Sequence, residues 1–454
     1  MKKRFLYSTG ILLLGGLIYG VFYLNSLMPI ITGYPAKFLC SAVFISNRDI
    51  KNVEAIDLNF SMIKYVRNKI NYEEKSVTSF FLWGKSKAIY REGFGAVLLR
   101  GDDEMTLINR KFPVVPRFPF NEDTLAGHIE NNNTDSNTGI SKSALQKIKV
   151  KLIDENGYHG NAFGFLAIHK GIRIIEGYKP GFNEKTRFLS WSMAKSFNNA
   201  LVGIMVNDGL LSLDRKAGIP EWQWDERDKI TLNNLLQMES GLEWNEDYGN
   251  RSDVTMMLYG SSDFAGFALN KRLSHPPGSF WYYSSGTANI IDLIIRRCFN
   301  SDSAYYAFAP RRLFNKTGMS DVVFETDPSG LLAGSSYIYA TARDYGLFGM
   351  LYLRNGVFNG ERILPEGWVK YTATPTANSK GRYGASFWLN RVKVYPDAPG
   401  DMFFCSGHDG QRIFIIPSKD LVVVILGYSP KRDGGMNFNQ LLKDILGALK
   451  QEDY

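Results

Sequence analysis

The longest apolar run lies close to the N-terminus. Ile11 to Met28 carry no charged side chain and follow the basic residues Lys2, Lys3 and Arg4. At 1.5 Å per residue, a helix of this length covers about 27 Å, close to the ~30 Å hydrocarbon core of a bilayer. The pattern predicts a membrane segment whose basic end stays inside the cell. A cleaved signal peptide and a buried hydrophobic helix are the alternatives, although residues 29–34 offer no small-x-small cleavage site.

The pattern after this run predicts an N-terminal extension over residues 31–140 that is built from short strands. Strands are expected over 42–45, 77–83 and 88–99, with a turn at 84–87. The very polar stretch 121–138 is expected to be a loop that ends the extension. The predicted division is a membrane anchor or signal segment over 1–30, the extension over 31–140, and a larger domain over 141–454.

The larger domain mixes the two periodicities. Helical spacing occurs over 141–154, 192–206, 286–297, 342–354 and 438–450, while paired strands are expected over 163–175 and in a hairpin of 412–416 with 421–426. The helix at 192–206 has so little charge that it should be buried. Strand hairpins at both ends with helices between them favour an α+β fold, in which an antiparallel sheet packs against helices.

Composition excludes several classes of protein. With 44% hydrophobic and 22% charged residues among 454, the chain is an ordinary globular one and not a disordered one. Its three cysteines are far apart, which argues against a disulfide scaffold or a cysteine-built zinc site. The net charge of +8 includes no basic block, so no nucleic-acid partner is predicted. Metal-binding motifs are missing from the sequence, and we predict neither a metal nor a cofactor.

A Ser-x-x-Lys arrangement occurs at Ser61–Lys64 and at Ser192–Lys195. Residues at i and i+3 share one face of a helix, so the lysine can reach the hydroxyl, but it must be neutral to accept the proton. Burial at the start of a low-charge helix favours the neutral form of Lys195. Ser61 lies among Arg67 and other polar residues and is expected on a surface helix. The sequence therefore predicts Ser192 as a nucleophile.

The surrounding sequence, Phe-Leu-Ser-Trp-Ser-Met-Ala-Lys-Ser-Phe over 188–197, resembles the first motif of the serine β-lactamase-like hydrolases. This family includes class C β-lactamases, related esterases and 6-aminohexanoate-dimer hydrolases. Further segments resemble its later motifs in the same order, at 230–241, 277–286, 340–346, 360–365 and 407–411. The resemblance covers residues 160–430 and leaves 33–140 outside. It implies an antiparallel sheet flanked by helices with a mainly helical subdomain, as in β-lactamases and penicillin-binding proteins.

The resemblance also implies roles for particular residues. Tyr283 would shuttle protons between Ser192, Lys195 and the leaving group, with the lysine charge helping the phenol to act as a base. Backbone N–H groups of Ser192 and Gln411 would form the oxyanion hole.

Two positions depart from the antibiotic-binding members. His408-Asp409-Gly410 stands where they have Lys-Thr-Gly, and Ser285 stands where the tyrosine motif has Asn. A histidine is mostly neutral at pH 7, so it attracts a substrate carboxylate less than a lysine does. We count His408, Gly410, Gln411 and Ser285 as substrate-binding or oxyanion residues. The departures favour an esterase or amidase over a β-lactamase or D-amino-acid peptidase.

The sequence therefore predicts a membrane-anchored serine hydrolase that acts on a small-molecule or short oligomeric substrate. The anchor is residues 11–28, and the catalytic domain faces away from the cytoplasm, on the periplasmic side of the inner membrane if the source is Gram-negative. A non-catalytic ligand-binding or assembly module on the same fold is the alternative of another class. The substrate, the oligomeric state and the role of residues 31–140 stay open at this point.

Overall fold

A six-stranded antiparallel sheet forms the centre of the computed structural model, which describes residues 2–101, 104–113, 115–116 and 140–449. The strand order is β12-β13-β14-β15-β5-β6. The polar segment predicted as a loop over 121–138 lies outside the described residues. The strands of this sheet are β5 (Ala162–His169), β6 (Ile172–Tyr178), β12 (Trp388–Leu389), β13 (Phe403–Ser406), β14 (Arg412–Ile416) and β15 (Leu421–Gly427).

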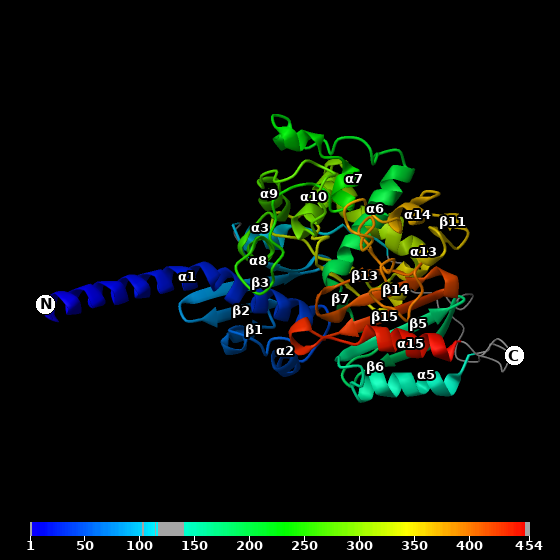
Figure 1. The fold of residues 1–454 in the computed structure, drawn as a ribbon, viewed down its shortest axis with the longest axis horizontal. Helices are drawn as coiled ribbons and strands as arrows, with labels where there is room; N and C mark the ends of the chain where they lie inside the picture. Colours follow the sequence, from blue (N-terminus) through cyan, green and yellow to red (C-terminus); the bar gives the residue numbers. More distant parts are fainter. Residues whose placement is uncertain (1, 102–103, 114, 117–139, 450–454) are drawn as a thin grey trace.

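Both faces of the sheet are covered, which explains why β15 is apolar at nearly every position. Val422 and Val424 belong to one core cluster, whereas Val423 and Ile425 belong to the other. This is the period of two expected when both faces of a strand are buried. Helices α5 (Lys142–Lys149) and α15 (Phe438–Ala448) lie side by side on one face, and α13 (Ala342–Leu353) packs on the other (Figure 1).

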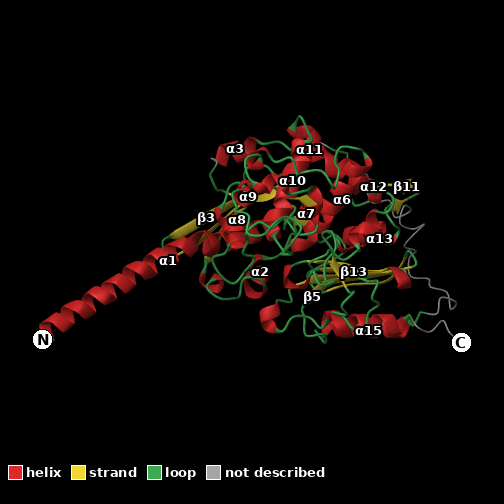
Figure 2. Ribbon diagram, turned by 45° about the horizontal axis from the view of Figure 1, so that its top comes forward, coloured by secondary structure: helices red, strands yellow, loops and turns green. Residues whose placement is uncertain are grey.

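The remaining helices gather on the α13 side and form a mainly helical subdomain around α6 (Figure 2). The prediction of an α+β fold with an antiparallel sheet is thus confirmed. These helices are α6 (Ala194–Asn207), α7 (Leu232–Leu236), α8 (Asp253–Gly260), α9 (Phe264–Leu269), α10 (Ser285–Arg297), α11 (Asp302–Ala309), α12 (Asn315–Thr317) and α14 (Trp368–Thr372). Two small sheets accompany them: β7 (Phe188–Leu189) with β9 (Ile338–Ala340) and β8 (Val323–Phe324), and β10 (Val357–Phe358) with β11 (Glu361–Arg362).

The N-terminal helix α1 (Lys2–Phe44) projects from the domain as a long rod (Figures 1 and 2). Within the described residues it is the one helix that is long and apolar enough to cross a membrane. From Met28 onward it is built into the domain, where Ala36, Leu39 and Cys40 are fully buried. The strand predicted over 42–45 is wrong. Residues 42–44 form the last turn of the buried helix α1, so their backbone groups bond within the helix and are not available for strand pairing.

A second antiparallel sheet packs against the buried half of α1. It turns at Leu82-Trp83, where Leu82 has a φ of +50°, and not at 84–87 as predicted. The predicted strand over 88–99 is divided by a turn that contains Gly93 (φ +76°). The elements of this region are β1 (Arg67–Asn71), β2 (Ser76–Phe81), β3 (Gly84–Arg91), β4 (Gly95–Leu98), α2 (Ile50–Ile56) and α3 (Glu104–Asn109).

The surface helix predicted at Ser61–Lys64 is also wrong. Ser61 has a φ of +43°, which a helix does not allow, and only a short 3₁₀ turn follows at Ile63–Tyr65. The geometry needed for a serine–lysine pair at i and i+3 is therefore missing at this copy of the motif.

A buried ion pair joins α1 to the larger domain. Lys37 Nζ contacts Glu325 Oε2, and the side chains of both residues are almost inaccessible to solvent. Ser41 Oγ and the backbone N–H of Ala96 donate to the other carboxylate oxygen at 2.9 and 2.7 Å. Because the hydrogen-bond and ion-pair partners of this carboxylate among the described residues all come from residues 37–96, the N-terminal segment completes the core of the domain.

Candidate active site

Ser192 lies in a 3₁₀ turn, Trp191–Met193, that leads directly into α6. Trp191 has a φ of +45°, which is costly for a bulky residue. Its buried ring is held between other aromatic rings, at 6.4 Å from Tyr34 and 6.1 Å from Tyr337. Packing therefore enforces a strained backbone immediately before the predicted nucleophile, and Ser192 lines a cavity.

Lys195 is buried one helical turn after Ser192. Its Nζ lies 3.0 Å from Ser192 Oγ, 3.0 Å from Ser285 Oγ and 2.9 Å from the carbonyl oxygen of Ser335. Burial lowers the pKa of Lys195 to about 8, although the charges of Glu246 and Asp292 oppose the shift. At pH 7 roughly a tenth of the lysine is therefore neutral. This is the environment that the sequence predicts for a base next to a serine.

Tyr283 lies on the other side of the lysine, with its ring centroid 4.8 Å from Lys195 Nζ. Burial and the negative charge of Glu246 raise its pKa, and a hydrogen bond with Ser192 and the charge of Arg412 only partly offset this. The phenol therefore keeps its proton. By family resemblance, the charge of Lys195 was expected to make this tyrosine a base, but the environment makes neutral Lys195 the better base of the two.

Glu246 is the principal residue that the sequence analysis missed. Its carboxylate accepts hydrogen bonds from the backbone N–H of Ser285 at 2.9 Å, from Ser285 Oγ and from Tyr248 OH at 2.9 Å. Ser285 is fully buried and touches Lys195, but it does not line the cavity. Its hydroxyl thus links Glu246 to the lysine from behind. No spacing in the sequence marks Glu246, because the loop that carries it reaches the site only through folding.

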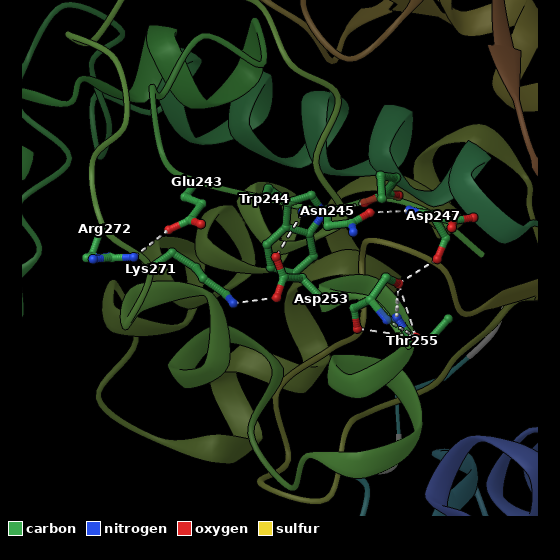
Figure 3. A network of polar contacts seen from close by, with 10 residues as sticks. Glu243, Trp244, Asn245, Asp247, Asp253, Thr255, Lys271 and Arg272 are labelled. Carbon is green, nitrogen blue, oxygen red and sulfur yellow. Dashed lines mark hydrogen bonds and ion pairs between the residues drawn. The ribbon is translucent and has the colours of Figure 1, made fainter. Parts of the chain in front are cut away.

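A network of polar contacts fixes this loop (Figure 3). Asp253 accepts from Lys271 on one oxygen and from the backbone N–H of Asn245 on the other, at 2.9 Å. Asn245 in turn accepts from the backbone N–H of Asp247 at 3.0 Å. The loop is thus tied down on both sides of Glu246, which holds the carboxylate at a defined distance from Ser285.

The third motif lies beside the cavity. The His408 side chain is 39% exposed, and its ring lies 4.9 Å from the Tyr248 ring. Gly410 has a φ of +95°, and a side chain there would meet Ser429, so glycine is needed. The Gln411 side chain pairs with both backbone groups of Gly427, and Gln411 is not among the residues that line the cavity, although its neighbours Gly410 and Arg412 are.

The cavity in front of Ser192 has a volume of about 1070 Å³. Its polar lining includes Glu246, Tyr283, His408 and Arg412, and Ser61 also lines it. Arg412 is a second functional candidate that was not predicted from the sequence. The sequence analysis gave it only as the first residue of a predicted strand. Within the described ranges no group of three or more histidine, cysteine or acidic residues could hold a metal ion.

The fold and this site define a β-lactamase-like hydrolase. A family model described as Beta-lactamase matches residues 156–443, well over half of the chain. The chain therefore belongs to this family, which includes amidase and esterase relatives.

Three similar proteins show how far the similarity extends. The 6-aminohexanoate-dimer hydrolase of Paenarthrobacter ureafaciens is 23% identical over 294 residues, which cover 59% of this chain and 73% of that protein. A Bacillus anthracis structure described provisionally as a 6-aminohexanoate-dimer hydrolase covers 78% of this chain and 96% of its own, with 22% identity and a TM-score of 0.59. EstCE1, described as a hydrolase with promiscuous acyltransferase activity, has a TM-score of 0.53 and 15% identity, covering 68% of this chain and 99% of its own. These likenesses confirm the β-lactamase and penicillin-binding-protein fold.

Proposed function

We propose that this protein is a serine hydrolase that cleaves an ester or amide bond through an acyl-enzyme on Ser192. The observation that carries the proposal is the 3.0 Å contact between Ser192 Oγ and the Nζ of a buried lysine whose pKa is lowered to about 8, at the wall of a large cavity. A hydroxyl next to a neutral amine is an activated nucleophile. A non-catalytic module would have no need for a desolvated lysine at this place.

In the proposed reaction, Ser192 Oγ attacks the substrate carbonyl carbon while neutral Lys195 takes its proton. The tetrahedral intermediate collapses when the carbon–oxygen or carbon–nitrogen bond breaks, and Tyr283 passes a proton to the leaving group and is reprotonated from Lys195. Water then attacks the acyl ester while neutral Lys195 takes its proton, and the acid is released as Lys195 passes that proton to Ser192 Oγ. Backbone N–H groups of Ser192 and Gln411 are the proposed donors to the oxyanion.

Glu246 and Ser285 act in this proposal as positioning residues. The carboxylate holds the Ser285 hydroxyl, and the hydroxyl holds Lys195 Nζ at hydrogen-bond distance. This differs from the predicted role of Ser285 as a substrate-binding residue, since Ser285 is fully buried and does not line the cavity. His408 and Arg412 line the cavity and are proposed to contact substrate.

Three features favour an ester or amide of low acidity over a β-lactam or a D-amino-acid peptide. The third motif carries the imidazole of His408 in place of the permanent ammonium of a lysine. The side chains that surround the cavity include the carboxylates of Glu246 and Asp247 beside the cations of Arg412 and Lys431, so the lining is not the purely cationic surface that would select an acidic substrate. The Paenarthrobacter relative is, by its name, a hydrolase of a 6-aminohexanoate dimer.

We also propose that α1 remains attached as a membrane anchor, with the hydrolase domain outside the cytoplasm. The support is the burial of residues beyond Met28 and the ion pair from Lys37 to Glu325, because removal of this segment would open the core. The exposed stretch over 11–22 is apolar. It is preceded by Lys2, Lys3 and Arg4, and positively charged residues beside a membrane segment favour the cytoplasmic side.

The experiment that tests the function is to trap the acyl-enzyme. The detergent-solubilised full chain is mixed with 4-nitrophenyl butyrate, quenched in acid, and examined by intact-protein and peptide mass spectrometry. We expect one butyryl group, located on the peptide that contains Ser192 and missing from Ser192→Ala. An adduct on a different residue, or turnover of the ester by Ser192→Ala at the wild-type rate, would contradict the proposal.

The pH dependence tests the assigned base. Because neutral Lys195 accepts the proton, kcat/KM is expected to rise with pH through about 8. Glu246 raises the pKa of Lys195 through its negative charge, so Glu246→Gln is expected to move this rise to lower pH, by about one unit. The measurement is kcat/KM for butyrate ester hydrolysis between pH 5.5 and 10.

Glu243→Gln is the matched control for this shift. Glu243 belongs to the same loop, but its exposed carboxylate pairs with Arg272 at 3.6 Å and not with the Ser285–Lys195 pair. The control should keep the wild-type pH profile. A Glu246→Gln profile that coincides with the wild type would show that the titrating group is not Lys195.

A further inference from the structure

One wall of the cavity comes from the N-terminal region and is apolar. Leu27, Ile30 and Ile31 of α1 line it, together with Phe60 and Met62 of the following segment. Leu27 and Ile30 are only half-buried, and Met62 is 43% exposed. These side chains leave an apolar surface open toward the reactive serine, although the family model begins only at residue 156.

This wall leads into the exposed part of α1. On the face that carries Leu27, the residues one and two helical turns earlier are Tyr23 and Tyr19, which are 45% and 72% exposed and whose rings stack at 6.4 Å. Beyond them, Leu12 is 76% exposed. The exposed part of α1 meets the cavity-lining part at the rim of the cavity. Tyr23 OH marks this point, because it donates a hydrogen bond at 3.2 Å to Asn250, a residue that lines the cavity. An apolar path therefore runs along one helix from the proposed bilayer to the cavity.

A turn with two exposed apolar side chains lies beside the same part of α1. The turn between β2 and β3 presents Leu82 and Trp83, which are 67% and 54% exposed. The indole N–H of Trp83 donates to Asn25 Oδ1 at 3.2 Å, which places this turn beside the helix between Tyr23 and Leu27. Tryptophan and tyrosine prefer the membrane interface, where one end of the side chain is wet and the other is apolar. The cavity thus opens close to the level of the bilayer surface.

We propose that the substrate is a membrane-resident amphiphile with an acyl ester or amide bond, whose hydrocarbon chain lies along α1 while its carbonyl reaches Ser192. This inference rests on the proposed function and adds the substrate class. The chain would pack on Leu27, Ile30 and Met62, and the polar head would lie among His408 and Arg412. A volume of about 1070 Å³ is at the upper end for a small-ligand site and accommodates an extended chain and a head group.

The test compares chain length in the full-length protein embedded in phosphatidylcholine nanodiscs. kcat/KM is measured for 4-nitrophenyl dodecanoate and 4-nitrophenyl butyrate, and the ratio of the two is the readout. We expect the wild type to prefer the dodecanoyl ester by at least about tenfold, because burial of the longer chain is favourable in proportion to its area. Leu27→Gln and Met62→Gln should each lower this ratio by about tenfold.

Matched control variants carry the same substitutions away from the cavity. Leu210→Gln and Met105→Gln replace side chains that are 56% and 62% exposed and do not line it, and both should keep the wild-type ratio. An unchanged ratio in both cavity variants, or a wild type that hydrolyses the dodecanoyl ester no better than the butyryl ester, would overturn the inference and leave the proposed function intact. Failure to hydrolyse either ester would instead contradict the proposed function, and the inference with it.

Discussion

Ser192→Ala is expected to lower kcat for ester hydrolysis by about 10⁴-fold or more, because the other hydroxyl that contacts Lys195, that of Ser285, does not line the cavity. The contact of 3.0 Å between Ser192 Oγ and Lys195 Nζ is removed, while the buried lysine keeps its bonds to Ser285 and Ser335. The measurement is initial rates with 4-nitrophenyl butyrate at pH 8.5, where most of the lysine is neutral.

Ser61→Ala is the matched control, since it removes the serine of the other Ser-x-x-Lys copy from the same cavity. Ser61 is followed by a 3₁₀ turn and not by a helix, and Lys64 Nζ lies over the Tyr65 ring at 5.1 Å. We expect this variant to lose no more than a few-fold in kcat. A comparable loss in both variants would mean that the cavity, and not the Ser192–Lys195 pair, carries the activity.

Lys37→Met is expected to lower the free energy of unfolding by about 3–5 kcal/mol, because it leaves the Glu325 carboxylate buried without its cation. Lys37 and Glu325 are 4% and 0% exposed, so solvent does not compensate for the lost partner. The loss should appear as a lower urea midpoint for the full chain in detergent, followed by tryptophan fluorescence.

Two variants separate burial from charge in this prediction. Lys316→Met breaks the exposed pair with Glu361, whose side chains are 42% and 54% exposed, and should cost less than about 1 kcal/mol. The double variant Lys37→Met/Glu325→Gln removes both buried charges and should recover part of the loss. If Lys37→Met unfolds at the wild-type urea concentration, then α1 is not part of the cooperative unit and our argument for its retention fails.

Local patterns predicted much of the larger domain. The hairpin predicted over 412–416 and 421–426 matched β14 and β15 almost to the residue, and the low charge of the helix after Ser192 correctly indicated that α6 is buried. Strand and helix periods depend on neighbours two to four residues apart, which the sequence displays directly. The region over 31–101 was predicted less well, since short apolar runs do not distinguish a buried helix from a strand.

The candidate site shows where local pattern stops being informative. Ser192 and Lys195 are one helical turn apart, so their contact could be predicted from spacing. Glu246 and Arg412 reach the same site from loops and strands far away in the chain, and no periodicity records that approach. Ser285 contacts Lys195 and Glu246 and does not line the cavity, a placement that packing decides and that no local spacing records.

The sequence by itself determined the apolar N-terminal helix, the α+β class, the serine–lysine pair and the family resemblance, because each depends on residue type and short spacing. Only the tertiary structure decided which Ser-x-x-Lys copy is helical, that α1 completes the core, and that its Leu27–Ile31 face forms a wall of the cavity. It also decided that burial raises the pKa of Tyr283, which stays protonated, and lowers the pKa of Lys195 to about 8. The physical reason is that desolvation and charge act through space, so a pKa or a cavity wall belongs to the folded arrangement and not to any one segment.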